Sequence, residues 1–134
     1  MELNVPITVE AGLRGHDLLR LRHRGRHCIP GNGILSTQVL QEFFVNVTKK
    51  IPRPVPVAIG REIVEDFLKW KVVPVEGRTI LRAIDLHEKH KYAFWDSLVI
   101  QSAIEGGARW LLSEDLRDGQ RIGDLTIRNP FLHE

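Results

Sequence analysis

Apolar residues recur every three or four positions just after residue 36, the spacing that gathers them on one face of a helix. Ser36 or Thr37 can cap this helix with its hydroxyl. Its buried stripe is predicted to contain Val39, Leu40, Phe43, Phe44 and Val47. Glu42 lies at the edge of that stripe. The prolines of segment 51–56 end the helix, because proline lacks the amide donor.

Three further helices are predicted downstream. The second runs from about residue 57 to 70 and is expected to bury Ile59, Ile63, Phe67 and Trp70. The third runs from residue 79 to about 90, with one face formed by Ile80, Ala83, Ile84 and His87. The fourth begins at about Asp96 and ends before Gly106 and Gly107, since glycine is a common helix stop.

Short apolar runs alternate with these helices and are predicted to be strands. The run at 71–75 contains Pro74, which indicates an edge position or a strand end. The run at 108–113 is typical of a buried strand and leads into the polar residues 113–115. A last strand is expected at 124–130. The alternation from residue 36 onward predicts an α/β fold with a largely parallel sheet.

Residues 1–34 fit this alternation poorly. Leu3, Val5, Ile7 and Val9 alternate as in a strand, and the glycines that follow leave room for one short helix. The same segment holds a basic cluster of Arg14, His16, Arg20, Arg22, His23, Arg24, Arg26 and His27. Guanidinium groups match phosphate geometry, so the cluster could contact nucleic acid, although a solvated basic surface is the simpler interpretation.

Composition places the chain among ordinary globular proteins. Its 134 residues are enough for one domain with a core, and 43% are hydrophobic while 27% are charged. No apolar run approaches the roughly 20 residues of a membrane span. The first residues lack the pattern of a secretory signal, and the single Cys28 cannot form an internal disulfide. We therefore expect a cytoplasmic protein with no membrane span, and the net charge of +2 is too small to identify a partner.

Three carboxylates fall where they could share one crevice: Glu42 within a helix, Asp96 at the first turn of another, and Asp115 just after a buried strand. Ligands of parallel sheets usually bind at the carboxyl ends of the strands. Gathered carboxylates need a cation between them, and oxygen ligands select Mg²⁺ or Mn²⁺. The alternative roles are a helix cap for Asp96, a turn former for Asp115 and an exposed helical residue for Glu42.

Three blocks of the sequence resemble the PIN-domain ribonucleases of the VapC toxin type. Residues 36–48 (Ser-Thr-Gln-Val-Leu-Gln-Glu-Phe-Phe-Val-Asn-Val-Thr) resemble the family's helix with its second acidic residue, at Glu42. Residues 95–103 (Trp-Asp-Ser-Leu-Val-Ile-Gln-Ser-Ala) resemble the helix start with the third, at Asp96. Residues 111–116, with the Gly119-Gln120 and Ile127–Phe131 segments, resemble the closing signature, which aligns Asp115 with the fourth.

The resemblance implies a three-layer α/β/α sandwich with a mainly parallel central sheet, formed by one PIN-like domain over residues 1–134. It implies Mg²⁺ or Mn²⁺ held by Glu42, Asp96 and Asp115, and endonucleolytic cleavage of RNA. A cognate antitoxin and a homodimer are further implied partners.

The N-terminal segment departs from the family pattern, in which an apolar strand leads into an Asp-x-Asn motif with the first acidic residue. Glu2 is the nearest counterpart by interval, and Asp17 is a poorer one because it lies too near Glu42. We therefore interpret the chain as a PIN domain whose N-terminal motif is altered or truncated. Two functions stay open at this point: an active metal-dependent ribonuclease, and a catalytically impaired PIN fold that binds RNA or an antitoxin. A non-nuclease α/β domain is disfavoured, because all three blocks would then be coincidental.

Overall fold

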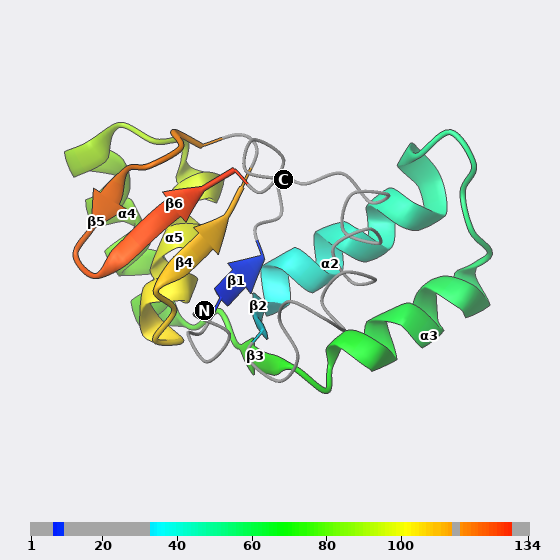
Figure 1. The fold of residues 1–134 in the computed structure, drawn as a ribbon. Helices are drawn as coiled ribbons and strands as arrows, with labels where there is room; N and C mark the ends of the chain where they lie inside the picture. The colour runs from blue at the N-terminus through cyan, green and yellow to red at the C-terminus, as the bar shows by residue number, and fades with distance from the viewer. Residues whose placement is uncertain (1–6, 10–32, 114–115, 130–134) are drawn as a thin grey trace.

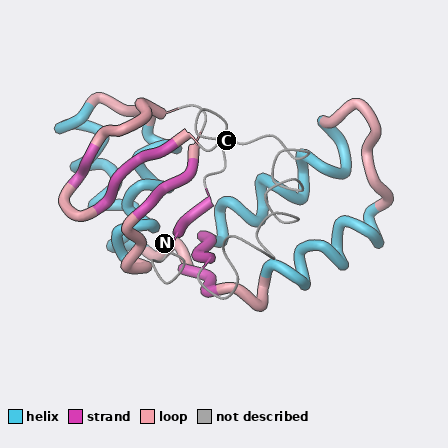
Figure 2. The backbone as a smooth tube through the Cα atoms, viewed as in Figure 1, coloured by secondary structure: helices cyan, strands magenta, loops and turns pink. Residues whose placement is uncertain are grey.

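A computed structural model describes residues 7–9, 33–113 and 116–129, with side chains described from residue 33 onward. Figure 1 shows how helices and strands alternate along the chain, and Figure 2 separates them by colour. The strands are β1 (Ile7–Val9), β2 (Gly33–Ser36), β3 (Lys71–Val73), β4 (Trp110–Leu112), β5 (Arg121–Ile122) and β6 (Leu125–Arg128). The helices are α2 (Thr37–Val45), the π-helical turn η1 (Asn46–Lys50), α3 (Val57–Phe67), α4 (Gly77–His90) and α5 (Phe94–Glu105).

The six strands form one sheet in the order β3-β2-β1-β4-β6-β5. Neighbouring strands from β3 to β6 run parallel, and β5 pairs antiparallel with β6. Ile7 pairs with both Gly33 and Trp110, so the short strand β1 joins β2 to β4. The carboxyl ends of β2, β1 and β4 therefore lie at one edge of the sheet.

Helices α5 and α4 lie together beside the sheet, with α5 against the strands and α4 packed on α5 (Figure 1). On the opposite side of the molecule, α2 and α3 pack against each other and extend away from the sheet (Figure 1). The third layer implied by the PIN-domain resemblance stays a prediction, because most of residues 1–32 lies outside the described residues.

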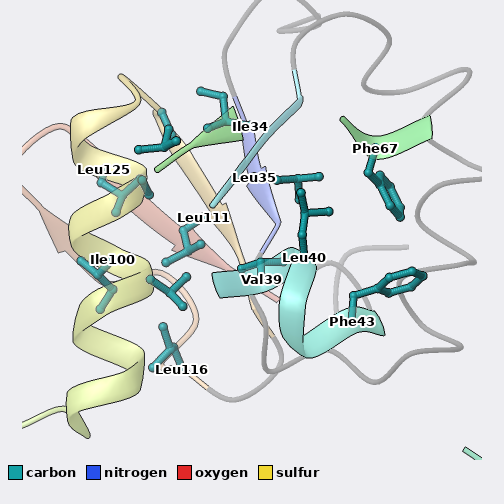
Figure 3. Close-up of a cluster of buried hydrophobic side chains, with 14 of the residues drawn as sticks. Ile34, Leu35, Val39, Leu40, Phe43, Phe67, Ile100, Leu111, Leu116 and Leu125 are labelled. Carbon is teal, nitrogen blue, oxygen red and sulfur yellow. The ribbon is translucent and has the colours of Figure 1, made fainter. Parts of the chain in front are cut away.

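Side chains from the sheet, α2, α3 and α5 form one apolar core (Figure 3). Its largest fully buried members are Phe43, Leu35, Ile100, Leu111, Leu125, Ile127, Val39, Val47 and Val99. The stripe predicted for the first helix is largely confirmed, since Val39, Leu40, Phe43 and Val47 are buried while Phe44 is half-buried. The edge position predicted for the strand before Pro74 is also confirmed, because β3 is an outer strand.

The faces predicted for the next two helices are partly wrong. In α3 the predicted burial of Ile63 and Phe67 is confirmed, but Ile59 is 42% exposed and Gly60 is buried in its place. Ile80 and Ile84 are exposed, because α4 turns Thr79 and Ala83 toward α5. Helical spacing alone could not fix which side of an apolar stripe meets the core.

Strand β2 is missing from the sequence prediction. Gly33 opens it and was interpreted as a turn residue, but a side chain there would collide with the ring of Trp70. Glycine at this position therefore permits close packing of Trp70 on the strand. The hairpin of β5 and β6 was also not predicted, because β5 has two residues and is too short to show an alternating pattern.

Candidate functional site

Two buried serines mark the carboxyl ends of β2 and β4. Ser36 is the N-cap of α2, and its hydroxyl accepts a hydrogen bond of 3.1 Å from the amide of Val39. Ser113 follows β4, and its hydroxyl accepts a bond of 3.1 Å from the amide of Leu116. Both side chains are almost fully buried. The serines fix how the chain leaves each strand at the edge where a parallel sheet usually binds its ligands.

Glu42 lies in the second turn of α2 and is half-buried. Gln38 lies one helical turn earlier on the same side of the helix, since residues four apart are neighbours there. Gln38 is 6% exposed, and its Oε1 atom has no hydrogen-bond partner among the described residues. An unpartnered buried oxygen is costly, so its position beside Glu42 favours a ligand or an ion at this surface.

Asp96 lies in the first turn of α5 and is half-buried. The N-cap of α5 is Ala93, without a side-chain capping bond, so the cap role considered for Asp96 is wrong. The helix starts two residues earlier than predicted, and Asp96 is its third residue. The amide groups of a helix start favour negative charge, which suits a carboxylate or a phosphate at this point.

Tyr92 connects the start of α5 with the loop that follows β4. Its hydroxyl donates a hydrogen bond to Oε1 of Gln120. Burial raises the pKa of Tyr92, the positive charge of Arg117 opposes that rise, and the negative charge of Asp96 adds to it. These influences place Asp96 and Arg117 in the same neighbourhood, although they come from segments about twenty residues apart.

Asp115 lies outside the described residues, as do Glu2, Asp17 and the basic cluster of residues 14–27. The described residues on either side of the pair 114–115 are Ser113 and Leu116, which are joined by the hydrogen bond from the amide of Leu116 to the hydroxyl of Ser113. Whether Glu42, Asp96 and Asp115 converge in one pocket therefore stays a prediction.

The position of β1 changes which N-terminal acid is of interest. The strand begins at Ile7, so Glu2 precedes it in the chain, whereas the first acidic residue of the motif should follow an apolar strand. Glu10 comes directly after Val9, which pairs with Leu112 of β4. Glu10 was not among the candidates of the sequence analysis, and it lies outside the described residues.

A divalent cation fits the chemistry of these donors. Glu42 and Asp96 supply carboxylates and Gln38 supplies an unpartnered amide oxygen, and Mg²⁺ and Mn²⁺ prefer such oxygen ligands. Within the described ranges, no group of three His, Cys, Asp or Glu residues is close enough to hold a metal ion. A complete site would thus require an acidic residue from outside the described ranges.

A second polar cluster lies at the other end of α5 and joins it to α4. Glu105 accepts hydrogen bonds from Thr79 (2.8 Å) and Gln101 (2.9 Å), and Arg82 lies 3.9 Å away. Burial alone would raise the pKa of Glu105, but these two hydrogen bonds and the charges of Arg78 and Arg82 lower it. The cluster is already satisfied by its own partners, which indicates a structural role.

An apolar groove of about 490 Å³ lies along α2 and α3. It is lined by Leu40, Gln41, Phe44, Val45, Val57, Arg61 and Val64. Val45 is 41% exposed and Val57 65% exposed, so a large apolar surface faces solvent here. Such a surface is typical of a contact with another protein. Among the described helices, none has the length and apolar character to cross a membrane.

Solved structures with a similar overall fold include toxin-antitoxin complexes and a toxin. The chain is similar to a toxin-antitoxin complex from Klebsiella pneumoniae, with a TM-score of 0.66 at 12% identity over 93% of this chain and 97% of the other. The chain has a VapC-like fold. No family model and no curated protein sequence matches it.

Two further structures share the VapC-like fold. VapC20 from Mycobacterium tuberculosis, a sarcin-ricin loop cleaving toxin, has a TM-score of 0.61 at 14% identity over 81% of this chain and 89% of its own. A DNA-bound VapBC from Salmonella typhimurium has a TM-score of 0.57 at 14% identity, over 92% of this chain and 97% of the other. At these identities the likeness establishes the fold alone.

Proposed function

We propose that this protein is a cytoplasmic endoribonuclease of the PIN-domain toxin type that depends on Mg²⁺ or Mn²⁺. The chain would act as one PIN-like domain over residues 1–134, a three-layer α/β/α sandwich. The observation that supports this best is the occurrence, within a VapC-like fold, of Asp96 in the first turn of α5 and Glu42 on the helix that leaves β2. Glu42, Asp96 and Asp115 would hold the metal and are the proposed catalytic residues.

Each of the chain's own groups has a distinct part in this proposal. The bound ion would supply Lewis acidity and an activated water for hydrolysis of a phosphodiester. Glu42 and Asp96 provide negative charge on rigid helices, which keeps their carboxylates in place without reorganisation. The positive end of the helix dipole at the start of α5 favours a substrate phosphate beside it. Gln38 offers its buried Oε1 atom as a hydrogen-bond acceptor one turn from Glu42.

We further propose Glu10 as the acidic residue that takes the place of the family's first aspartate. It follows β1 in the chain, as the motif requires, whereas Glu2 comes before the strand. Glu10→Gln should weaken Mg²⁺ binding by more than tenfold, and Glu2→Gln is the matched control that should leave it unchanged. Equal effects of the two substitutions would remove Glu10 from the proposal.

The second candidate function is a PIN fold that has lost cleavage and acts by binding RNA or an antitoxin. The apolar groove between α2 and α3 favours a protein partner, and two of the similar structures are toxin-antitoxin assemblies. An antitoxin-type protein is the occupant we propose for this groove in either case. A homodimer is also proposed, by resemblance to the toxin family, and sedimentation analysis would test it.

Cleavage of a mixed RNA pool distinguishes the two functions. The wild-type protein should cut RNA in Mg²⁺ and stop in EDTA, and Asp96→Asn should lower the rate by more than tenfold. Asp85→Asn is the matched control, because Asp85 is an exposed aspartate on α4. If the wild type cleaves no RNA in Mg²⁺ or Mn²⁺, the ribonuclease function is excluded and the binding function remains. Equal cleavage by the wild type and Asp96→Asn would remove Asp96 from the site.

A further inference from the structure

Strands β4, β6 and β5 present two very different faces. On one face Leu111, Ile127 and Leu125 are fully buried in the core that includes α5. Successive side chains of a strand point to opposite sides, so the residues between them lie on the outer face. The outer face contains Trp110, Leu112, Arg121, Thr126 and Arg128. Leu112 is buried, and we call the other four residues the arginine face.

The strand register brings three of these residues into one row. Trp110 pairs with Thr126 across β4 and β6, and Thr126 pairs with Arg121 across β6 and β5. Paired residues in a sheet share a face and lie about 5 Å apart. An indole, a hydroxyl and a guanidinium therefore follow one another across the three strands.

Arg128 completes the set from the end of β6. Its guanidinium carbon lies 5.7 Å from the centre of the Trp110 ring, in cation–π contact range. This contact orients the arginine while it leaves the edge of the guanidinium available to an anion. Arg121 and Arg128 are both exposed, and strands β4, β5 and β6 contain no acidic residue.

The arginine face runs up to the proposed cleavage site. The backbone carbonyl of Arg128 accepts a hydrogen bond of 3.0 Å from the amide of Ser113. Ser113 immediately precedes Glu114 and Asp115 in the chain. The row itself ends at Trp110, the first residue of β4, while Arg128 pairs with Leu112 and extends the arginine face to the carboxyl end of that strand.

We infer that the arginine face binds single-stranded RNA next to the cleavage site, an inference that rests on the proposed ribonuclease function. Arginines bind phosphates in a fixed geometry, and an aromatic ring offers a flat surface on which a base can stack. Single-stranded RNA presents both groups at once, since its bases are not paired. A protein partner would instead need a larger apolar area, and this face has one half-buried indole among polar groups.

The test is RNA affinity, measured in EDTA so that cleavage does not interfere. A labelled RNA of about 12 nucleotides, within the length that one single-stranded site covers, is titrated with protein and followed by fluorescence anisotropy. The double variant Arg121→Gln/Arg128→Gln should bind at least tenfold more weakly than the wild type. Its slope of log affinity against log salt should fall by about 1.4, because each phosphate contact to a single strand contributes about 0.7.

Lys49→Gln/Arg53→Gln is the matched control, because it removes two exposed cationic side chains, one in η1 and one in the loop that follows it. The control should bind RNA like the wild type. Trp110→Phe keeps an aromatic surface and should retain more affinity than Trp110→Leu, while the melting temperature of each reports whether the strand still folds.

Unchanged RNA affinity and salt dependence in the Arg121/Arg128 double variant would overturn the inference, as would an equal loss in the control. The inference would also be overturned if the wild type is a dimer while the double variant is a monomer with unchanged RNA affinity. The face would then be a protein contact. If the wild type cleaves RNA in Mg²⁺ and the double variant binds RNA as tightly as the wild type, only the inferred role of the arginine face is refuted. Absence of cleavage by the wild type would refute the ribonuclease function instead.

Discussion

Ser36 and Ser113 lie at the same level of the sheet on either side of β1. Gly33 and Trp110 both pair with Ile7. Ser36 comes three residues after Gly33, and Ser113 comes three residues after Trp110. Two strand spacings separate them, roughly 10 Å. Each hydroxyl accepts a bond of 3.1 Å from an amide three residues later. The chain thus leaves β2 and β4 with the same kind of hydrogen bond, from a backbone amide to a serine hydroxyl. The segment after β2 contains Glu42, and the segment after β4 contains Asp115.

Removal of either hydroxyl should destabilise the fold by a similar amount. Ser36→Ala takes away the cap of α2, and Ser113→Ala leaves the amide of Leu116 without its acceptor. Each should lower the free energy of unfolding by about 1 kcal/mol, measured by urea denaturation. Ser36→Thr retains the hydroxyl and is the control. Wild-type stability in both alanine variants would show that these bonds contribute nothing.

The role of Asp96 separates into a metal-dependent and a metal-independent part. Without metal, Asp96→Asn should change the free energy of unfolding by less than about 1 kcal/mol, since the residue is not a cap and a charge near a helix start contributes at most this much. With Mg²⁺ at a hundred times its dissociation constant, the wild type should gain about 2.7 kcal/mol. Asp96→Asn and Glu42→Gln should lose most of that gain in thermal melting. An equal rise in all three proteins would indicate that Mg²⁺ binds elsewhere.

Glu105 should make the protein sensitive to acid. Its pKa in the folded state is lowered, so its stabilising effect is fully present above the unfolded-state pKa of about 4.3. That effect is lost as the pH falls through the lower, folded-state pKa. Glu105→Gln should flatten the dependence of unfolding free energy on pH in this acidic window, as urea titrations at several pH values can show. The same slope in Glu105→Gln and in the wild type would assign the acid sensitivity to other carboxylates.

Val57 offers a direct test of the groove between α2 and α3. It is 65% exposed, so Val57→Lys should fold normally while it places a charge in the apolar groove. A candidate antitoxin that inhibits RNA cleavage by the wild type should bind this variant at least tenfold more weakly, by calorimetry. Leu81→Lys is the control, because Leu81 is 66% exposed on α4, away from the groove. Equal loss of binding in both variants would count against the groove.

The sequence predicted those parts of the fold in which local pattern and packing agree. The helices around Glu42 and Asp96 were located to within two residues, because an apolar stripe and prolines defined the first and a pair of glycines ended the second. Strand β2 was missed, since Gly33 is explained only by the distant ring of Trp70. The exposure of Ile80 depends on the angle at which α4 meets α5, which no local pattern encodes. Glu10 required the knowledge that β1 ends at Val9.

The central place of β1 has a consequence for how the molecule is made. Ile7 pairs with Trp110 across about 100 residues of chain, and β1 is the strand that connects β2 to β4 within the sheet. Contacts between such distant residues form slowly, because a long loop must close first. During synthesis the first strand must therefore wait until β4 has left the ribosome. The helices that carry Glu42 and Asp96 can form earlier, but the two halves of the sheet, and with them any site at their shared edge, are joined only after β4 has been synthesised.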